Sequence, residues 1–131
     1  KWLNNKKLDA VIHLAAIVPI KSVNNDKKKA YQVNYLGTKN IVDAIKKENI
    51  KWFFFASTSH VYQSKKGKID EKSKINPISY YGKTKYLAEK YIIKKLNENK
   101  TNYCIGRIFS TTNKNQKKNY LIPDLKNKIK K

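Results

Sequence analysis

The sequence predicts an α/β domain built around a parallel sheet. Short apolar segments alternate with two longer segments of helical periodicity, in the order strand, helix, strand, helix, strand. Parallel strands need a long crossover connection, and each helical segment is long enough to provide one. No linker and no internal repeat divides the 131 residues, so we expect the segment 1–131 to be part of one domain.

The first half of the pattern holds two strands and a helix. The first strand is predicted at 9–14, a short run rich in β-branched residues. A helix at 26–48 follows, capped by Asn25 or Asp26. The second strand, 51–56, consists of aromatic and small residues after its first position, which is typical of a buried strand. The apolar face of the helix is formed by Ala30, Val33, Leu36, Ile41, Ala44 and Ile45.

The second half starts with a polar loop at 61–79, which is long for a connection and therefore indicates a functional or mobile segment. A helix is predicted at 79–97 and a third strand at 103–109, in which Cys104 is interpreted as a small core residue. A short last helix is expected from position 121 onward.

The charge of the chain is strongly positive, with 30 Lys and Arg against 9 Asp and Glu and a net charge of +21. Arg107 is the single arginine, whereas proteins that grip phosphates or bases favour Arg for its planar fork. The lysines are scattered, and Lys, Asn and Ile share A/T-rich codons. We therefore expect a solvated lysine surface and no specific nucleic-acid partner, with a basic nucleic-acid binder as a competing hypothesis.

The chain is expected to work in the cytoplasm, away from membranes. The longest mostly apolar run, 10–20, is shorter than the roughly 20 residues of a membrane span. A single cysteine excludes an internal disulfide and fits a reducing compartment. Because the sequence contains no methionine, we expect it to be an internal fragment of a longer protein.

Polar residues follow each predicted strand, where ligands of parallel sheets bind. Tyr81 and Lys85 then share one helix face, since they are four residues apart. An ammonium about 4 Å from a phenol contributes roughly 4 kcal/mol at an effective dielectric constant near 20, enough to lower a phenol pKa by about three units. Tyr81 is thus a candidate general acid/base, with the Thr58 hydroxyl as its partner. The competing interpretation is chance, because the Tyr91 and Lys95 pair has the same spacing.

Several segments in order resemble the extended short-chain dehydrogenase/reductases, in the NAD-dependent sugar-nucleotide epimerase/dehydratase branch. They are the run 9–16, the Asn34-x-x-Gly37-Thr38 helix, the Ser-Thr-x-x-Val-Tyr segment at 57–62, the stretch 69–89 with Tyr81 and Lys85, and 107–109. The resemblance implies a Rossmann-type doubly wound parallel sheet. The family's glycine-rich phosphate turn is absent from this sequence. We therefore expect the first strands and the C-terminal substrate lobe to lie outside the chain.

The resemblance also implies roles for individual residues, a nicotinamide cofactor (NAD or NADP), a nucleotide-sugar substrate and no metal. Asn34 has an equally weighted alternative, which is to cap or bridge the helix backbone. The implied catalytic residues are Tyr81, Lys85 and Thr58; the implied cofactor contacts are Ala15, Ala16, Asn34, Ser57, Tyr81 and Lys85; the implied substrate contacts are Ser59, His60 and Ser110.

The residues after Thr58 narrow the implied reaction. Related dehydratases carry a carboxylate there for the elimination of water, whereas this chain has Ser59 and His60. The resemblance therefore implies an epimerase or a 4-keto reductase, with a homodimer formed through the helices 26–48 and 79–97. The competing interpretation of His60 is a polar loop residue without a role in the site. His13 is interpreted as a core histidine with a hydrogen-bond partner. The alternative function is a catalytically inactive binding protein or a truncated paralogue.

Overall fold

A parallel three-stranded sheet forms the centre of the computed structural model, which describes residues 8–18, 20–45, 48, 50–111, 115–116 and 121–129. The strands β1 (Ala10–His13), β2 (Trp52–Thr58) and β3 (Asn102–Ile108) lie in the order β1-β2-β3. Both strand pairings are parallel, as the sequence predicts. β2 continues two residues beyond its predicted end, so Ser57 and Thr58 lie within the strand, opposite Arg107 and Ile108 of β3.

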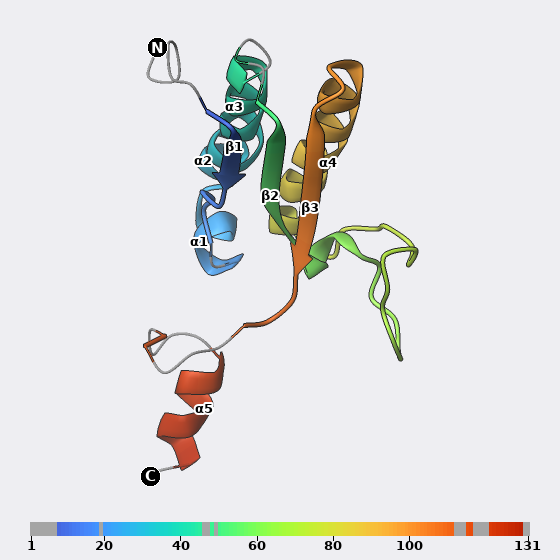
Figure 1. Cartoon of the computed structure of the whole chain (residues 1–131). Helices are drawn as coiled ribbons and strands as arrows, with labels where there is room; N and C mark the ends of the chain where they lie inside the picture. The colour runs from blue at the N-terminus through green and yellow to red at the C-terminus, as the bar shows by residue number, and fades with distance from the viewer. Residues whose placement is uncertain are drawn as a thin grey trace.

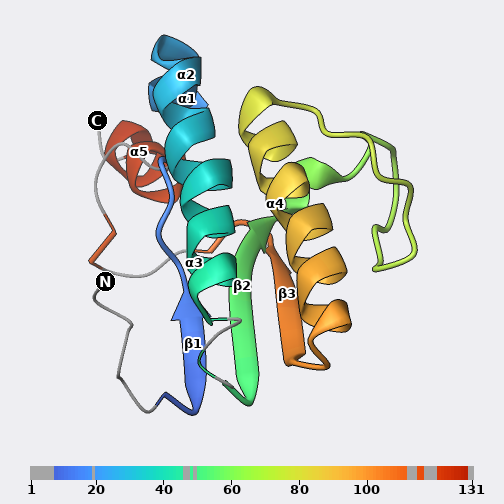
Figure 2. The same cartoon turned by 90° about the horizontal axis from the view of Figure 1, so that it is seen from above.

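The helices between positions 27 and 98 gather on one face of the sheet (Figure 1). α1 (Ile20–Asn25) leads into α2 (Lys27–Tyr31), a π-helical segment η1 (Gln32–Gly37) and α3 (Thr38–Ile45). α4 (Tyr80–Glu98) lies beside α3 over the strands (Figure 2). Their contact with β2 forms the hydrophobic core, which contains Val42, Ile45, Ile50, Phe53, Phe55, Ala88, Ile92 and Leu96.

The predicted helix 26–48 is present over 27–45 in three joined parts, while residues 46 and 47 lie outside the described part of the chain and residue 48 is in a turn. The buried stripe of the helix differs from the prediction. Asp26 caps it by accepting a hydrogen bond from the Lys29 backbone N–H at 2.8 Å. Val33, predicted in the core, is 38% exposed. The π-helical segment winds more residues into each turn than an α-helix does, which moves the buried stripe onto positions four residues apart. That stripe consists of Ala30, Asn34, Thr38 and Val42, and Ile45 continues it three residues later.

β2 is buried on the helix side, β3 is at most half-buried there, and the other face of the sheet is more exposed, which corrects the prediction of fully buried strands. Phe53 and Phe55 face the helices and are buried. Ile12, Phe54 and Cys104 occupy one row across the other face. There Ile12 is 65% exposed and Cys104 is also exposed, so Cys104 is not a core residue. None of the helices in the described part of the chain covers this face (Figure 1).

The connection between β2 and α4 begins with a short 3₁₀ turn, η2 (Ser59–Val61), and is tied back to it by backbone hydrogen bonds. Ile78 N–H donates to the His60 carbonyl at 3.1 Å, and Asn76 N–H donates to the Val61 carbonyl at 3.1 Å. The predicted last helix is present as α5 (Leu121–Ile129), which lies apart from the sheet beyond the carboxyl ends of the strands (Figure 1). No helix within the described ranges is long and apolar enough to cross a membrane.

Candidate functional site

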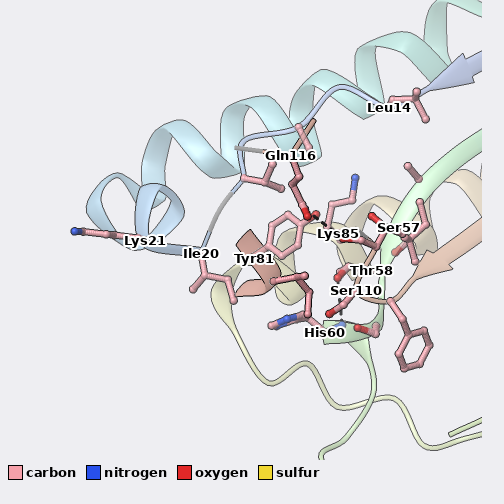
Figure 3. Close-up of a pocket in the computed structure, with 18 residues that line it drawn as sticks. Leu14, Ile20, Lys21, Ser57, Thr58, His60, Tyr81, Lys85, Ser110 and Gln116 are labelled. Carbon is pink, nitrogen blue, oxygen red and sulfur yellow. Dashed lines mark hydrogen bonds between the residues drawn. The ribbon is translucent and has the colours of Figure 1, made fainter. Parts of the chain in front are cut away.

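A pocket of about 630 Å³ opens at the carboxyl ends of the strands. It brings together the three predicted catalytic residues Tyr81, Lys85 and Thr58, and Figure 3 shows their side chains around one hollow. Of the other predicted site residues, Ala16, Ser57, Ser59, His60 and Ser110 also line it. Ala15 and Asn34 do not belong to its lining. The sheet therefore gathers residues from four separate parts of the sequence, as the strand ends predict.

Tyr81 and Lys85 enter the pocket from the first turns of α4. The helix begins there because the Ser79 hydroxyl accepts a hydrogen bond from the Gly82 N–H at 3.0 Å. The Lys85 side chain is 1% exposed, and its Nζ lies 4.0 Å from the centroid of the Phe55 ring. Burial lowers the Lys85 pKa to about 8, while the negative charge of Glu89 opposes this shift. Lys85 therefore remains mostly protonated at neutral pH and presents a buried cation to the pocket.

The turn that carries Thr58 is fixed against the start of α4. The Thr58 hydroxyl accepts a hydrogen bond from the His60 backbone N–H at 3.3 Å. His60 Nδ1 lies 3.2 Å from the Ser79 hydroxyl, and its ring meets the Tyr81 ring edge-on at 6.1 Å. A Cβ at Gly82 would lie 2.3 Å from the His60 carbonyl oxygen, so only glycine permits this approach. The contact holds Thr58 and Tyr81 on adjoining walls of the same pocket.

Ser57 of the pocket lining contacts an ion pair that the sequence does not predict, between the buried Glu89 and the partly buried Arg107. The Glu89 carboxylate accepts a hydrogen bond from the Ser57 hydroxyl. It also accepts bonds from Arg107, with Nη2 at 2.8 Å and Nε at 3.2 Å. The sequence signal for the pair is partial: Arg107 is the single arginine, but the spacing along α4 does not say which carboxylate it meets.

Asn34 joins separate elements instead of contacting the pocket. Its Oδ1 accepts a hydrogen bond from the Ile17 backbone N–H at 2.7 Å, and its Nδ2 donates to the Ile17 carbonyl at 3.3 Å. Nδ2 also lies 3.3 Å from the Thr84 hydroxyl of α4. Asn34 therefore holds the segment after β1 against two helices. The predicted alternative is a bond to the helix's own backbone, whereas the Asn34 amide binds the backbone of Ile17 in another segment. The role of Asn34 toward the cofactor stays a prediction.

His13 is a core histidine with a hydrogen-bond partner, as predicted. It is 6% exposed, and its Nε2 lies 2.9 Å from the Thr38 hydroxyl. That hydroxyl donates its own proton to the Asn34 carbonyl at 2.8 Å. Nε2 therefore carries the proton and donates to Thr38. Burial, with a smaller contribution from the positive charge of Lys85, lowers the His13 pKa to about 4 and keeps the ring neutral.

The lining of the pocket suits a nicotinamide nucleotide. Hydroxyl groups can bind ribose oxygens, a buried ammonium can face a ribose or phosphate, and Ala16 leaves room for close approach. The sequence has no glycine-rich phosphate turn, which is the part of a dinucleotide site that binds the pyrophosphate. The described residues include no group of three or more His, Cys, Asp or Glu that could hold a metal ion.

Known proteins that this chain resembles share its fold and family. The sequence model of the NAD dependent epimerase/dehydratase family matches residues 1–131. A UDP-glucose 4-epimerase of Lactobacillus helveticus is 35% identical over 91 residues, which are 69% of this chain and 28% of that protein. The chain thus spans less than a third of that relative.

Two solved structures have the same arrangement of elements. One is RMD from Pseudomonas aeruginosa complexed with NADPH, with a TM-score of 0.86 and 26% identity over 96% of this chain and 44% of that one. The other is UDP-glucuronic acid 4-epimerase from Bacillus cereus in complex with UDP-glucuronic acid and NAD, with a TM-score of 0.84 and 27% identity over 92% of this chain and 39% of that one. The match of the family model over all 131 residues, together with this shared fold, shows that the chain belongs to the NAD dependent epimerase/dehydratase family.

Proposed function

We propose that this chain is the central part of an NAD- or NADP-dependent sugar-nucleotide epimerase or 4-keto reductase. The observation that carries the proposal is the pocket at the strand ends, where a phenol, a buried ammonium and a hydroxyl from Tyr81, Lys85 and Thr58 line one hollow. The similarity to a UDP-glucose 4-epimerase and to structures holding NAD or NADPH supports the cofactor and the substrate class.

In this proposal Tyr81 accepts the proton of a sugar hydroxyl and returns it in the reverse direction. A bound nicotinamide supplies the hydride acceptor and donor. A phenol with an ordinary pKa near 10 is almost entirely protonated at neutral pH. The positive charge of Lys85 attracts the phenolate and therefore favours the ionised form that accepts the proton. The Thr58 hydroxyl, held at the end of β2, donates a hydrogen bond to the same substrate oxygen and orients it.

The remaining polar lining is assigned to binding. Ala16, Ser57 and Lys85 face the cofactor, while Ser59, His60 and Ser110 contact the sugar nucleotide. None of the described residues that line the pocket is Asp or Glu. This supports an epimerase or a reductase over a dehydratase, since the elimination of water needs an acidic group near the reacting carbon.

The test compares two neighbouring phenols in the complete polypeptide that contains these residues. Tyr81→Phe is expected to lower kcat by roughly 10²- to 10⁴-fold, the usual contribution of general acid/base catalysis. Cofactor affinity, measured by NADH fluorescence titration, should change little. Tyr80→Phe is the matched control, because Tyr80 is adjacent on α4 and does not line the pocket.

Two outcomes would contradict the proposal. Normal turnover of UDP-sugars by Tyr81→Phe removes Tyr81 from the mechanism. Cofactor binding without turnover of any nucleotide sugar by the unaltered polypeptide favours the alternative of a catalytically inactive binding protein.

A further inference from the structure

Two walls of the pocket are joined behind it by hydrogen bonds between buried side chains. One wall is the segment after β1, where Ala16 and Val18 line the pocket, and the other is the start of α4, with Tyr81 and Lys85. Ile17 lies between the two residues of the first wall, and its backbone N–H and carbonyl are both hydrogen-bonded. Whatever holds the Ile17 backbone therefore also places Ala16 and Val18.

Thr84 connects the side chain that holds Ile17 to α4. Asn34 Oδ1 accepts a hydrogen bond from the Ile17 N–H at 2.7 Å, and Asn34 Nδ2 donates to the Thr84 hydroxyl at 3.3 Å. The Thr84 hydroxyl donates in turn to the Tyr81 carbonyl at 2.8 Å. Asn34 and Thr84 are both buried. Each group donates to the next, an arrangement in which hydrogen bonds strengthen one another.

A threonine inside a helix often bonds a carbonyl of the preceding turn and does nothing further. The bond from Thr84 to the Tyr81 carbonyl fits this ordinary case by itself. The bond from Asn34 does not, because it comes from a residue 50 positions earlier in the chain. The Asn34 amide nitrogen has two protons, and the Ile17 carbonyl binds the other one. Both protons are thus used only while Thr84 offers its hydroxyl oxygen.

We propose that Thr84 is a positioning residue of the candidate site, which together with Asn34 sets the distance between the wall at 16–18 and the Tyr81 backbone. Tyr81 and Lys85 are one helical turn apart, so fixing the Tyr81 backbone also fixes the turn that carries Lys85. The proposal rests on the proposed function for the catalytic meaning of Tyr81 and Lys85. The link between the walls rests on the hydrogen bonds alone.

The link is tested by amide hydrogen exchange of the complete polypeptide, followed by NMR. Thr84→Val keeps the shape of the side chain and removes the hydroxyl, so Asn34 Nδ2 loses an acceptor. The Ile17 amide should then exchange about tenfold faster relative to the Phe53 amide. Phe53 lies in the central strand and reports on the stability of the whole domain. A general destabilisation raises the Phe53 rate at least as much, so it does not increase this ratio.

Two further variants separate the hydroxyl from the rest of the side chain. Thr84→Ser keeps the hydroxyl and should keep the wild-type ratio of the two exchange rates. Thr101→Val is the matched control, because it makes the same change at a half-buried threonine beyond the other end of α4. It should also leave the ratio unchanged.

The effect on the pocket is measured by fluorescence titration with NADH. Ala16 and Lys85, one from each wall, face the cofactor in the proposed function. NADH affinity should therefore weaken severalfold in Thr84→Val, in which the two walls are no longer tied together. It should return to the wild-type value in Thr84→Ser.

A wild-type exchange ratio in folded Thr84→Val, or a ratio raised equally in Thr84→Ser or Thr101→Val, would overturn the link. A raised ratio with unchanged NADH affinity would overturn the positioning role. If Thr84→Val does not fold, Thr84→Ala replaces it in the comparison with Thr84→Ser, with the same expected results. Failure of the unaltered polypeptide to bind NADH contradicts the proposed function, whereas the exchange measurement needs no cofactor and tests the link separately.

Discussion

The contact between α4 and the turn after β2 can be tested with two glycines of the same chain. Gly82 and Gly37 both lie in helical segments. An added Cβ at Gly82 would lie 2.3 Å from the His60 carbonyl oxygen and 2.8 Å from its carbonyl carbon, whereas at Gly37 the nearest atom would be the Gln32 carbonyl oxygen at 3.6 Å. Alanine therefore fits at Gly37 without movement and forces the backbone apart at Gly82.

The expected magnitudes follow from this difference. Glycine to alanine in a helix interior stabilises by up to about 1 kcal/mol, and this gain is common to both positions. At Gly82 an overpacking cost of about 1–3 kcal/mol opposes it. Loss of the hydrogen bond from Ile78 N–H to the His60 carbonyl costs about 1 kcal/mol more. Gly37→Ala should therefore be more stable than Gly82→Ala by about 2–4 kcal/mol.

The assay is urea denaturation of the complete polypeptide, with the free energy of unfolding extrapolated for the two variants and the wild type. Gly82→Ala should also weaken binding in the pocket, because the displaced turn carries Thr58. Equal stability of the two variants at similar m-values would refute the close approach of His60 to α4.

Two further predictions concern the polar core. His13 binds a proton more weakly in the folded state than in the unfolded state, since its pKa falls from 6.5 to about 4. The free energy of unfolding should therefore rise with pH across this window, by about 3 kcal/mol, and His13→Gln should remove this part of the slope in denaturation at a series of pH values. Asn34→Ala should lower the free energy of unfolding by about 2–3 kcal/mol, because the Asn34 amide holds the Ile17 backbone and Thr84. The exposed Asn40 on the same helical run supplies the control Asn40→Ala, and equal losses in the two variants would contradict the bridging role.

Most of the fold could be predicted from the sequence because its signals are local. Runs of β-branched or aromatic residues and helical spacing place every strand and both long helices to within a few residues. Burial on the two faces of the sheet is not a local property. Cys104 lies in a strand whose outward face meets no described helix, and nothing in the sequence around it indicates that.

The site was predictable to the extent that it follows the strand ends. Parallel strands bring Thr58, Ser59 and Ser110 to one edge whatever the details of packing, and the pocket lies there. The Glu89 and Arg107 pair depends instead on which side chain of α4 faces which residue of β3. That pairing is set by the crossing of a helix over a strand, which spacing along one element does not encode.

Asn34 shows why the pattern of apolar residues alone predicts the wrong buried face for this helix. Hydrophobic periodicity counts only apolar residues, and it selects Val33 for the core. In the structure the buried positions are the polar Asn34 and Thr38. Their burial costs little because each is satisfied: Thr38 pairs with His13 of β1, and Asn34 binds the Ile17 backbone. A helix turned to bury Val33 would leave these partners without hydrogen bonds in the core, at about 1–3 kcal/mol for each unsatisfied group. The hydrogen bonds of Asn34 and Thr38 thus stabilise the fold more than the burial of Val33 would. Those of Asn34 also hold the segment after β1, which forms one edge of the pocket.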